Sequence, residues 1–385
     1  MEKKKCIFHV PNYIDTSGKS GSQVRPIKMR EALENIGYDV EIISGYGIER
    51  KKKIEKIKQR VKAGVKYEFL YSESSTMPTL LTEKKHLPKY PNLDFDFFKF
   101  CKKNAIPIGL FYRDVFWKFE QYRNAVPWYY KIVTYPFYKY DLFKYNQLVD
   151  ILYLPSKEIA RYVPECKKIK QKVLLPGASY NQDNVNKRIK YYQKREMSTI
   201  NIFYVGGVSG IYDILDFVKI VRDYSYVKLT ICCKKEMWET ERERYKPFLT
   251  DRITIVHKSG EELIPYYHEA DICACYFDVE KHKYMKIATP IKLFEYISYL
   301  TPIISTKGGC AGDFVQQYNI GWSIPYREEA IRELLEYLHN EPNEIILKQK
   351  NIFACLEKNT WENRALQLEK DLRRIKNERT VIKEN

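Results

Sequence analysis

The sequence predicts an α/β protein of two doubly wound parallel-sheet domains facing across a cleft, with a C-terminal helix that packs back toward the N-terminal domain. First, 385 residues exceed the roughly 250 to 300 at which a single hydrophobic core stops growing. Second, short β-branched or aromatic runs alternate with helical stretches in both halves, which is typical of parallel sheets covered by helices. Third, a polar, basic stretch divides the halves. The composition, 44% hydrophobic and 30% charged, excludes a disordered chain.

The first domain is expected over residues 1–180. It opens with a strand at 5–10, a polar loop, a helix from Pro26 to Ile36 that Gly37 closes, and a second strand at 39–44. This order is a βαβ unit. Further strands are expected at residues 68–71, 106–112, 151–154 and 172–175.

Residues 181–198 are expected to be the linker, and the alternation restarts in a second domain over residues 199–357. Its strands are expected at residues 200–205, 227–232, 253–256, 272–276 and 302–305, and helices at 211–221, 260–268 and 291–300. A last helix, from Trp361 to Arg374, lies in a segment 358–376 that returns to the first domain, before a tail at 377–385.

The excess positive charge is confined to the first half. Residues 1–200 carry 39 Lys and Arg against 21 Asp and Glu, whereas residues 201–385 carry 27 against 28. A coding bias toward lysine would raise both halves. The asymmetry therefore indicates an anionic partner of the first half, such as a membrane surface, a nucleic acid or an acidic substrate.

The sequence favours a cytoplasmic protein. No run approaches the roughly 20 apolar residues of a membrane-spanning helix, and residues 1–5 lead into a strand without a small-residue cleavage site. The nine cysteines include no CxxC pair, so buried reduced thiols are favoured over metal ligands.

The segment from Thr289 to Ser305 carries the sharpest signal. Thr289 is a plausible N-cap and Pro290 suits the first helical turn, so the positive end of this helix would attract a phosphate. Lys292 adds a charge there, and Glu295, three residues later, can accept two hydrogen bonds from a ribose diol. The alternative is an ordinary solvated Lys/Glu pair on an amphipathic helix.

Several strings together resemble the retaining GT-B glycosyltransferases of family 4, whose two domains are Rossmann-like. PIKLFEYISYLTPIIS, with FYVGGVSGIYDILDFVKIV and IPYYHEADICACYF before it, resembles that family's donor-binding half. SGSQVRPIKMREALENIGYDVEIISG and DILYLPSKEIARYV resemble segments of its first half. The resemblance covers about residues 5–376, and the motifs occur in the family's order.

The resemblance implies roles for individual residues. Glu295 would hold the ribose of a nucleotide sugar, and Lys292 would contact its diphosphate, near Pro290 at the start of the helix. Gly206 and Gly207 would let the backbone approach the diphosphate. These assignments place the donor in the second domain.

Further donor contacts are implied from the other domain. The opening loop, Ser20-Gly21-Ser22, would close over the same phosphates, with Arg25 as a weaker candidate. The sequence departs from the family where a first glutamate is expected, because position 287 is Ile287. It also lacks the arginine and lysine that commonly follow the first strand of the donor domain, and Lys258 would supply part of that charge.

The resemblance also implies the mechanism: retaining transfer with front-face departure of the nucleotide, without a protein nucleophile or a metal. Asp114 would orient the acceptor hydroxyl and Arg113 would hold an acidic group, unless the pair only fixes a loop. Asp94-Phe95-Asp96 has the form of a metal-binding motif but reads better as a helix N-cap and first-turn acid. His9 ends a strand and is expected to be a satisfied structural histidine rather than a substrate contact.

The stretch from Trp117 to Tyr145 is rich in aromatic residues with Lys and Arg between them. Trp and Tyr favour membrane interfaces, and basic residues attract anionic lipids. The stretch is therefore either a docking surface on the inner face of the plasma membrane or an aromatic core helix pair with solvated lysines. Nucleic acid is not expected as a partner, because no nucleic-acid-binding motif is present.

These observations lead to one function and its alternatives. We expect a hexosyltransferase-like, metal-independent enzyme without a cofactor. It would move a sugar from a nucleotide sugar, with UDP as the expected nucleotide, to a hydroxyl of a glycan or lipid-linked acceptor in the biosynthesis of a bacterial surface polysaccharide. The alternatives are a nucleotide-sugar epimerase or hydrolase on the same fold, and a catalytically degraded sugar-nucleotide-binding scaffold.

Overall fold

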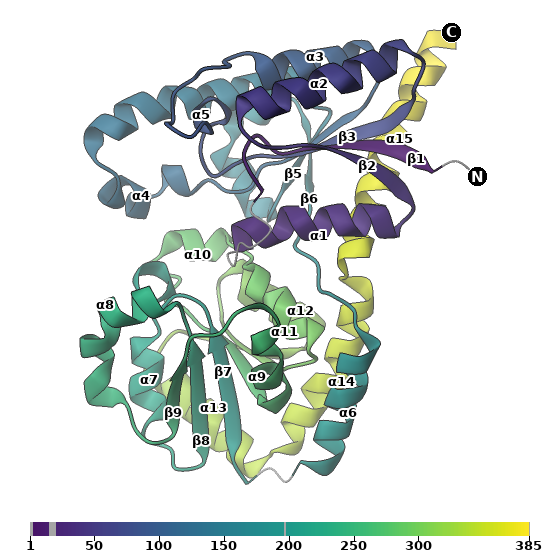
Figure 1. Cartoon of the computed structure of the whole chain (residues 1–385). Helices are drawn as coiled ribbons and strands as arrows, with labels where there is room; N and C mark the ends of the chain where they lie inside the picture. Colours follow the sequence, from purple (N-terminus) through teal and green to yellow (C-terminus); the bar gives the residue numbers. More distant parts are fainter. Residues whose placement is uncertain (1–2, 15–20, 196–197, 385) are drawn as a thin grey trace. The chain divides into compact units, whose positions relative to one another are not determined.

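The computed structural model describes residues 3–14, 21–195 and 198–384. The chain forms two compact units (Figure 1). Unit 1 combines residues 1–176 with residues 361–385, and unit 2 contains residues 177–360. Each unit has a six-stranded sheet in which every strand pairing is parallel. The predicted fold class of two doubly wound α/β domains is confirmed.

The sheet of unit 1 has the order β2-β1-β3-β4-β5-β6. Because β1 lies between β2 and β3, the direction of strand addition reverses beside β1, and ligands of such sheets bind at that reversal. Its strands are β1 Lys4–His9, β2 Tyr38–Ile43, β3 Tyr67–Glu73, β4 Ile108–Phe111, β5 Ile151–Leu154 and β6 Lys170–Val173.

Helices cover both faces of this sheet (Figure 1). They are α1 Gly21–Asn35, α2 Gly47–Lys62, α3 Leu93–Lys103, α4 Glu120–Ala125, α5 Trp128–Leu148 and α15 Trp361–Glu384, with 3₁₀ turns at Thr79–Leu81, Phe116–Lys118, Lys157–Tyr162 and Pro164–Cys166.

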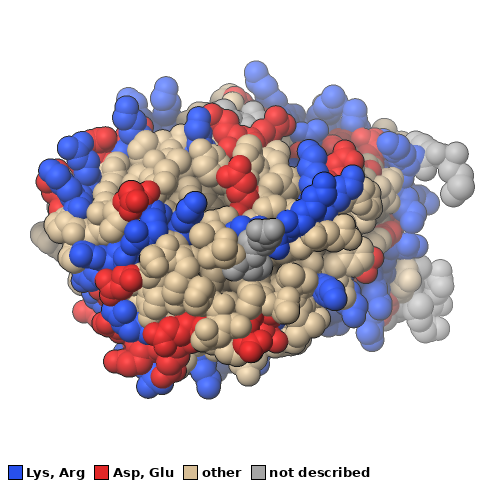
Figure 2. All heavy atoms as spheres, turned by 90° about the horizontal axis from the view of Figure 1, so that it is seen from below, with Lys and Arg blue, Asp and Glu red and all other residues tan. Residues whose placement is uncertain are grey.

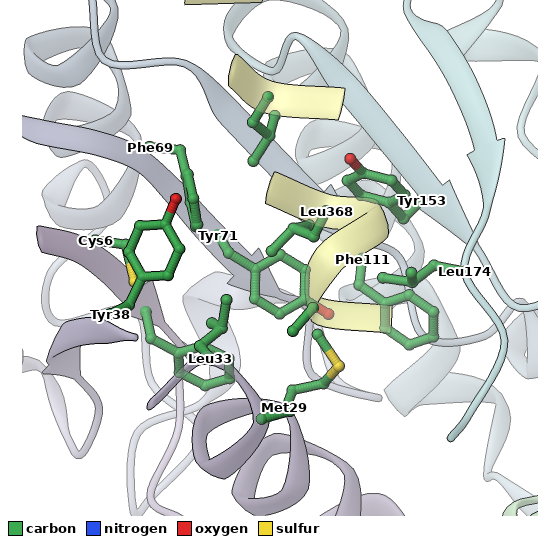
Figure 3. Close-up of a cluster of buried hydrophobic side chains, with 14 of the residues drawn as sticks. Cys6, Met29, Leu33, Tyr38, Phe69, Tyr71, Phe111, Tyr153, Leu174 and Leu368 are labelled. Carbon is green, nitrogen blue, oxygen red and sulfur yellow. The ribbon is translucent and has the colours of Figure 1, made fainter. Parts of the chain in front are cut away.

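The last helix, α15, completes the core of unit 1. In Figure 3 its Leu368 lies among the aromatic rings that Tyr71, Phe111 and Tyr153 contribute from the sheet. Trp361, Ala365 and Leu372 of the same helix are also buried in this cluster. The C-terminal helix therefore packs on the N-terminal domain, as the sequence predicted, and it is ten residues longer than the expected 361–374.

The sheet of unit 2 has the order β12-β11-β10-β7-β8-β9. Its strands are β7 Ile200–Val205, β8 Val227–Cys232, β9 Ile253–Val256, β10 Ile272–Cys275, β11 Ile303–Thr306 and β12 Gly321–Ile324. The reversal of strand order lies between β7 and β10, so the carboxyl ends of these two strands mark the expected ligand position.

Nine further helices belong to the described part of unit 2. They are α6 Gln182–Lys194, α7 Leu215–Val221, α8 Lys235–Tyr245, α9 Ile264–Glu269, α10 Lys283–Ile287, α11 Ile291–Ser298, α12 Cys310–Tyr318, α13 Glu328–Asn340 and α14 Asn343–Lys358, with 3₁₀ turns at Gly210–Tyr212, Lys246–Phe248 and Gly260–Leu263.

The prediction that residues 181–198 form a linker is wrong, because this segment contains helix α6. Val185, Arg188 and Tyr192 of this helix are buried, and the Arg188 guanidinium donates to the main-chain oxygens of His268 and Ala270. A buried arginine interrupts the apolar periodicity that identifies a helix in sequence. The helix packs within unit 2, whose first residue is Gly177.

Unit 1 carries the whole net charge of the chain. It has 41 Lys and Arg against 24 Asp and Glu, a balance of +17, whereas unit 2 has 25 of each. On the face drawn in Figure 2, basic and acidic side chains are interspersed. In the part of the chain that the structure describes, no helix is long and apolar enough to cross a membrane.

Candidate nucleotide-sugar site

The candidate site of unit 2 lies at the reversal of its strand order. Gly206 follows the last residue of β7, and Cys275 is the last residue of β10. Helix α11 follows β10 in the chain and carries Lys292 and Glu295. The side chains singled out from the sequence therefore lie at the edge of the sheet where doubly wound folds bind ligands.

Lys292 directs its ammonium group into an aromatic cage. Its Nζ lies 4.6 Å from the ring centroid of Tyr204, 4.9 Å from that of Tyr212 and 5.0 Å from that of Phe277. The same nitrogen is 3.4 Å from the Tyr204 hydroxyl. Ring faces stabilise a cation, but burial lowers the pKa of Lys292 to about 8, and the charges of Cys275 and Glu295 offset this only in part.

Gly206 is required beside this lysine. Its φ of +154° is rarely adopted by residues with a side chain, and a Cβ atom there would lie 2.3 Å from Nζ of Lys292. The next residue, Gly207, accepts a hydrogen bond of 2.5 Å from the Tyr204 hydroxyl, and a Cβ on it would lie 3.2 Å from Cβ of Tyr212. The loop therefore brings bare backbone against the ammonium group.

Glu295 lies one turn further along α11 and is partly buried. Burial raises the pKa of its carboxyl group, while Lys292 and a hydrogen bond from Tyr267 act in the opposite direction. The Tyr267 hydroxyl lies 3.5 Å from Oε2, which is at the limit of a hydrogen bond. The carboxylate is thus held without a strong cationic partner, and it retains the capacity to accept hydrogen bonds from a diol.

The start of α11 differs by one residue from the prediction. Pro290 occupies the N-cap, with ψ of 143°, and no side chain caps the helix, so the predicted N-cap at Thr289 is wrong. The residue before a proline avoids the helical region, which places the boundary after Pro290. Pro290 also lines a small cavity with Ala288, Ser305 and Gly309.

Lys258 follows β9 and lies apart from the aromatic cage. Its Nζ is 3.0 Å from Oε1 of Glu262, and this hydrogen bond raises the pKa of Lys258. The side chain is 43% exposed. Its charge is already shared with an acidic neighbour, so it would have to exchange that partner to contact a ligand.

Comparison with known proteins finds a family model that resembles unit 2. Residues 199–340 match the model of the family described as glycosyl transferases group 1. The match lies within unit 2 and includes Gly206, Lys292 and Glu295. The chain resembles the group 1 glycosyltransferases. No curated protein matches its sequence.

Solved structures share the fold of the whole chain. Sucrose-phosphate synthase from Thermosynechococcus elongatus is 14% identical, with 97% of this chain and 99% of that chain covered and a TM-score of 0.63. HepE from Anabaena, solved with UDP-glucose, is 10% identical, with coverage of 95% and 99% and a TM-score of 0.62. WaaG, a glycosyltransferase involved in lipopolysaccharide biosynthesis, is 12% identical, with coverage of 95% and 99% and a TM-score of 0.60. These similarities establish the GT-B fold.

Ile287 occupies the position at which the resemblance led us to expect a first glutamate. It is the last residue of α10 and is fully buried. An aliphatic side chain accepts no hydrogen bond, so the Ile287 side chain contributes packing, and only its main chain could contact a hydroxyl group.

In unit 1, Arg113 and Asp114 follow β4, so they lie beyond the end of this strand as predicted. The Arg113 guanidinium lies 3.4 Å from Oε2 of Glu73 and donates to the main-chain oxygen of Ser74. Asp114 accepts a hydrogen bond from the main-chain nitrogen of Phe116. Burial raises the pKa of Asp114, and the Phe116 hydrogen bond and Arg113 only partly counteract it.

Arg25 is enclosed in unit 1 and is 3% exposed. Its Nε lies 3.3 Å from Glu73, and its guanidinium carbon lies 3.5 Å from the centroid of the Phe111 ring. A phosphate could reach this arginine only if that packing opened. Of the predicted loop, Ser20 lies outside the described residues, and Gly21 begins α1, so Gly21 and Ser22 belong to a helix rather than a loop.

A buried ionic network follows β1. Nε2 of His9 lies 2.9 Å from Asp94, whose carboxylate also receives two hydrogen bonds from Arg50, of 2.9 and 3.0 Å. Burial would raise the pKa of Asp94, but His9 and Arg50 outweigh it and hold the pKa below its usual value. His9 is thus satisfied within the fold, as expected.

Asp94 and Asp96 both lie in the first turn of α3, so the prediction of a first-turn acid is confirmed. The N-cap expected within this motif is wrong, because Asn92 is the N-cap. Among the described residues there is no cluster of three or more His, Cys, Asp or Glu that could hold a metal ion.

The sequence analysis missed the aromatic residues of the candidate site. Tyr204, Tyr212 and Phe277 come from three separate segments and come together around Lys292 in the folded unit. The sequence did contain one signal. Tyr204 lies at the end of a predicted strand, and Tyr212 and Phe277 follow predicted strands within eight residues. Such positions line the carboxyl edge of a parallel sheet.

Proposed function

We propose that the chain is a retaining, hexosyltransferase-like glycosyltransferase that uses a nucleotide sugar, with UDP as the nucleotide. The acceptor would be a hydroxyl of a glycan or a lipid-linked sugar in the assembly of a bacterial surface polysaccharide. The observation that carries the proposal is the pairing of Lys292 and Glu295 on α11, beside Gly206 at the reversal of strand order. The UDP-glucose complex of HepE and the pathway of WaaG support the donor and the product class.

In this proposal the donor site stabilises the leaving group. The bond between the anomeric carbon and the diphosphate oxygen breaks, and the acceptor oxygen forms the new bond on the same face. The proton of the acceptor hydroxyl passes to the departing phosphate oxygen. The Lys292 ammonium and the main chain at Gly206 would stabilise the negative charge that develops, while Glu295 would accept hydrogen bonds from the ribose.

Unit 1 would supply the residues that bind the acceptor. Asp114 would orient the acceptor hydroxyl, and Arg113 would hold an acidic group of the acceptor. The chemistry needs no protein nucleophile and, in this proposal, no metal ion. The excess positive charge of unit 1 supports an acidic or membrane-bound acceptor, with the enzyme in the cytoplasm at the inner face of the membrane.

One alternative has a specific observation in its favour. The buried Ile287 removes an expected acidic contact, which favours a sugar-nucleotide-binding scaffold without activity. A nucleotide-sugar epimerase or hydrolase would use the same fold, but a small substrate gives no reason for the basic charge of unit 1.

A ligand panel tests the proposal. Purified protein is heated with UDP, GDP, dTDP, ADP or CMP, each with magnesium and with EDTA, because a ligand that binds only the native state raises the unfolding temperature. We expect a rise with UDP that EDTA does not abolish. Consumption of UDP-sugars is then measured with and without an acceptor glycan. Nucleotide binding without sugar consumption would favour the scaffold, and consumption that no acceptor accelerates would favour the epimerase or hydrolase.

A further inference from the structure

Helix α4 and the first half of α5 form a helical hairpin that leaves the body of unit 1. None of the described residues from Glu120 to Phe137 is buried. In Figure 1 this hairpin lies at the edge of unit 1, away from its sheet. The aromatic stretch for which the sequence left two interpretations is therefore divided. Trp117 and Phe119 are buried, whereas residues 120–137 are not part of the core.

The start of α5 presents large apolar side chains to solvent. We call this cluster the apolar tip: Trp128, Tyr129, Tyr130, Ile132 and Val133, which are 69%, 53%, 56%, 64% and 55% exposed. A single exposed apolar residue is ordinary, but a contiguous cluster marks an interaction site. At 3.6 residues per turn the five side chains cover about 200° of the helix circumference, which is wider than the single stripe by which a helix packs on a core.

The second half of the same helix behaves differently. Tyr138, Asp141, Leu142 and Tyr145 are buried, at the three- and four-residue spacing of a helix that packs by one face. Pro136 separates the two halves, and it lacks the N–H that would bond to the main-chain oxygen of Ile132. The exposed half of α5 and the half that packs on unit 1 thus meet at Pro136.

Contacts within the hairpin hold the tip in place. The rings of Trp117 and Tyr138 stack with centroids 4.6 Å apart, and those of Tyr122 and Tyr135 with centroids 6.4 Å apart. Lys131 Nζ donates a hydrogen bond of 2.8 Å to the main-chain oxygen of Arg123 and joins the two helices. The apolar tip is therefore supported from below by aromatic packing.

The charges around the tip have one predominant sign. Residues 118–144 carry five basic side chains, Lys118, Arg123, Lys131, Lys139 and Lys144, against two acidic ones, Glu120 and Asp141. Asp141 is buried, so it contributes little to the surface. The partner of the tip is thus expected to be apolar and rimmed by negative charge.

We propose that the apolar tip inserts into the interface of an anionic lipid bilayer. Trp and Tyr side chains favour the headgroup region, and basic residues beside them attract anionic lipids. The exposed part of α5 has ten residues, Trp128 to Phe137, about 15 Å of helix, so it embeds in one interface and does not span the roughly 30 Å apolar layer. A second copy of the chain fits less well, because it would bring together two units that each carry +17.

This inference rests on the membrane part of the proposed function and is tested without nucleotide. Wild-type protein and a Trp128→Ser/Ile132→Ser variant are sedimented with vesicles of phosphatidylcholine, alone or mixed with phosphatidylglycerol. We expect wild-type protein to bind the mixed vesicles, more weakly at high salt, and the variant to lose about tenfold or more in affinity. Trp128 is 69% exposed at the tip. Brominated lipid should therefore quench the fluorescence of wild-type protein more than that of Trp128→Phe.

A matched control distinguishes binding through the apolar tip from nonspecific binding by other exposed apolar residues. Ile48→Ser/Leu87→Ser removes two apolar residues of unit 1, 51% and 54% exposed, and should leave vesicle binding unchanged. Equal binding of the tip variant and wild type would overturn the proposal. So would an absence of vesicle binding, or self-association of wild type that the tip substitutions abolish. Stabilisation by UDP should be the same in all variants, so a failure of the donor site is seen separately.

Discussion

The two units differ in whether the charged side chains at the carboxyl edges of their sheets have strong ionic partners. In unit 1, Asp94 is held by Arg50 and His9, and Glu73 by Arg25 and Arg113. In unit 2, Lys292 and Glu295 have tyrosine hydroxyls at 3.4 and 3.5 Å and ring faces around the ammonium. The charged side chains that follow strands of the first sheet are thus paired with opposite charges, whereas Lys292 and Glu295 of the second unit have weaker partners. A ligand gains most from the available charges, because it replaces no strong ion pair.

The largest expected effect is on stability in unit 1. Asp94→Ala leaves the buried Arg50 guanidinium without its bidentate partner, and such a loss costs about 3 to 5 kcal/mol in the free energy of unfolding. Urea denaturation of the variant and wild type measures it. Asp94→Asn, which keeps the shape of the side chain, is the milder companion if Asp94→Ala does not fold. A small change in both variants would mean that this network is not the structural element described.

The next effect is on ligand binding in unit 2. Glu295→Gln should weaken UDP binding by about 10- to 100-fold, because hydrogen bonds to a charged group contribute roughly 1.5 to 3 kcal/mol. Its free energy of unfolding should change by less than about 1 kcal/mol, since burial already disfavours the charged carboxylate. Isothermal titration calorimetry with UDP gives the affinity. Glu333→Gln, on the exposed face of α13, serves as the control and should bind as wild type does.

The smallest effect is a pH dependence of the same site. Because the pKa of Lys292 is lowered to about 8, the ammonium loses its proton as pH rises through 8, and affinity for UDP should fall about tenfold for each unit above that value. Below pH 8 the affinity should be flat with respect to this group. Lys292→Arg keeps its charge over the whole range and should remove the step. Affinity that stays constant from pH 7 to about 9.5 in wild type would exclude Lys292 as a diphosphate contact.

The same lysine also affects stability, with the opposite dependence on pH. Between about 8 and its unfolded value of about 10.4, the unfolded chain binds a proton that the folded chain does not. The contribution of Lys292 to the free energy of unfolding therefore rises with pH over this interval. A loss of UDP affinity above pH 8 is thus not an effect of this group on folding.

Local patterns predicted the sheets well. The expected strands at residues 151–154, 200–205, 227–232 and 253–256 have the observed bounds, because each is a short run rich in β-branched and other apolar residues. Helix α6 was missed because Arg188 occupies one of its buried positions. A sequence pattern shows where apolar residues recur, and it does not show a guanidinium that main-chain oxygens satisfy.

The candidate site was predictable only in part, for a related reason. Lys292 and Glu295 are three residues apart on one helix, so their proximity is local. The cage around Lys292 joins residues 88 and 80 positions earlier, Tyr204 and Tyr212, and only the folded sheet brings them together. The partner of Arg25 could not be predicted for the same reason, since Glu73 lies 48 positions later, at the end of β3.

Helix α15 sets an order of events during synthesis. The core of unit 1 needs Trp361 and Leu368, yet 184 residues, the whole of unit 2, are translated between Pro176 and Trp361. At about 5 to 20 residues per second, the ribosome takes on the order of 10 to 40 s to supply the missing helix. During that time Phe111 and Tyr153 are without their last covering layer. The core of the N-terminal half can therefore be completed only after the C-terminal segment has been translated.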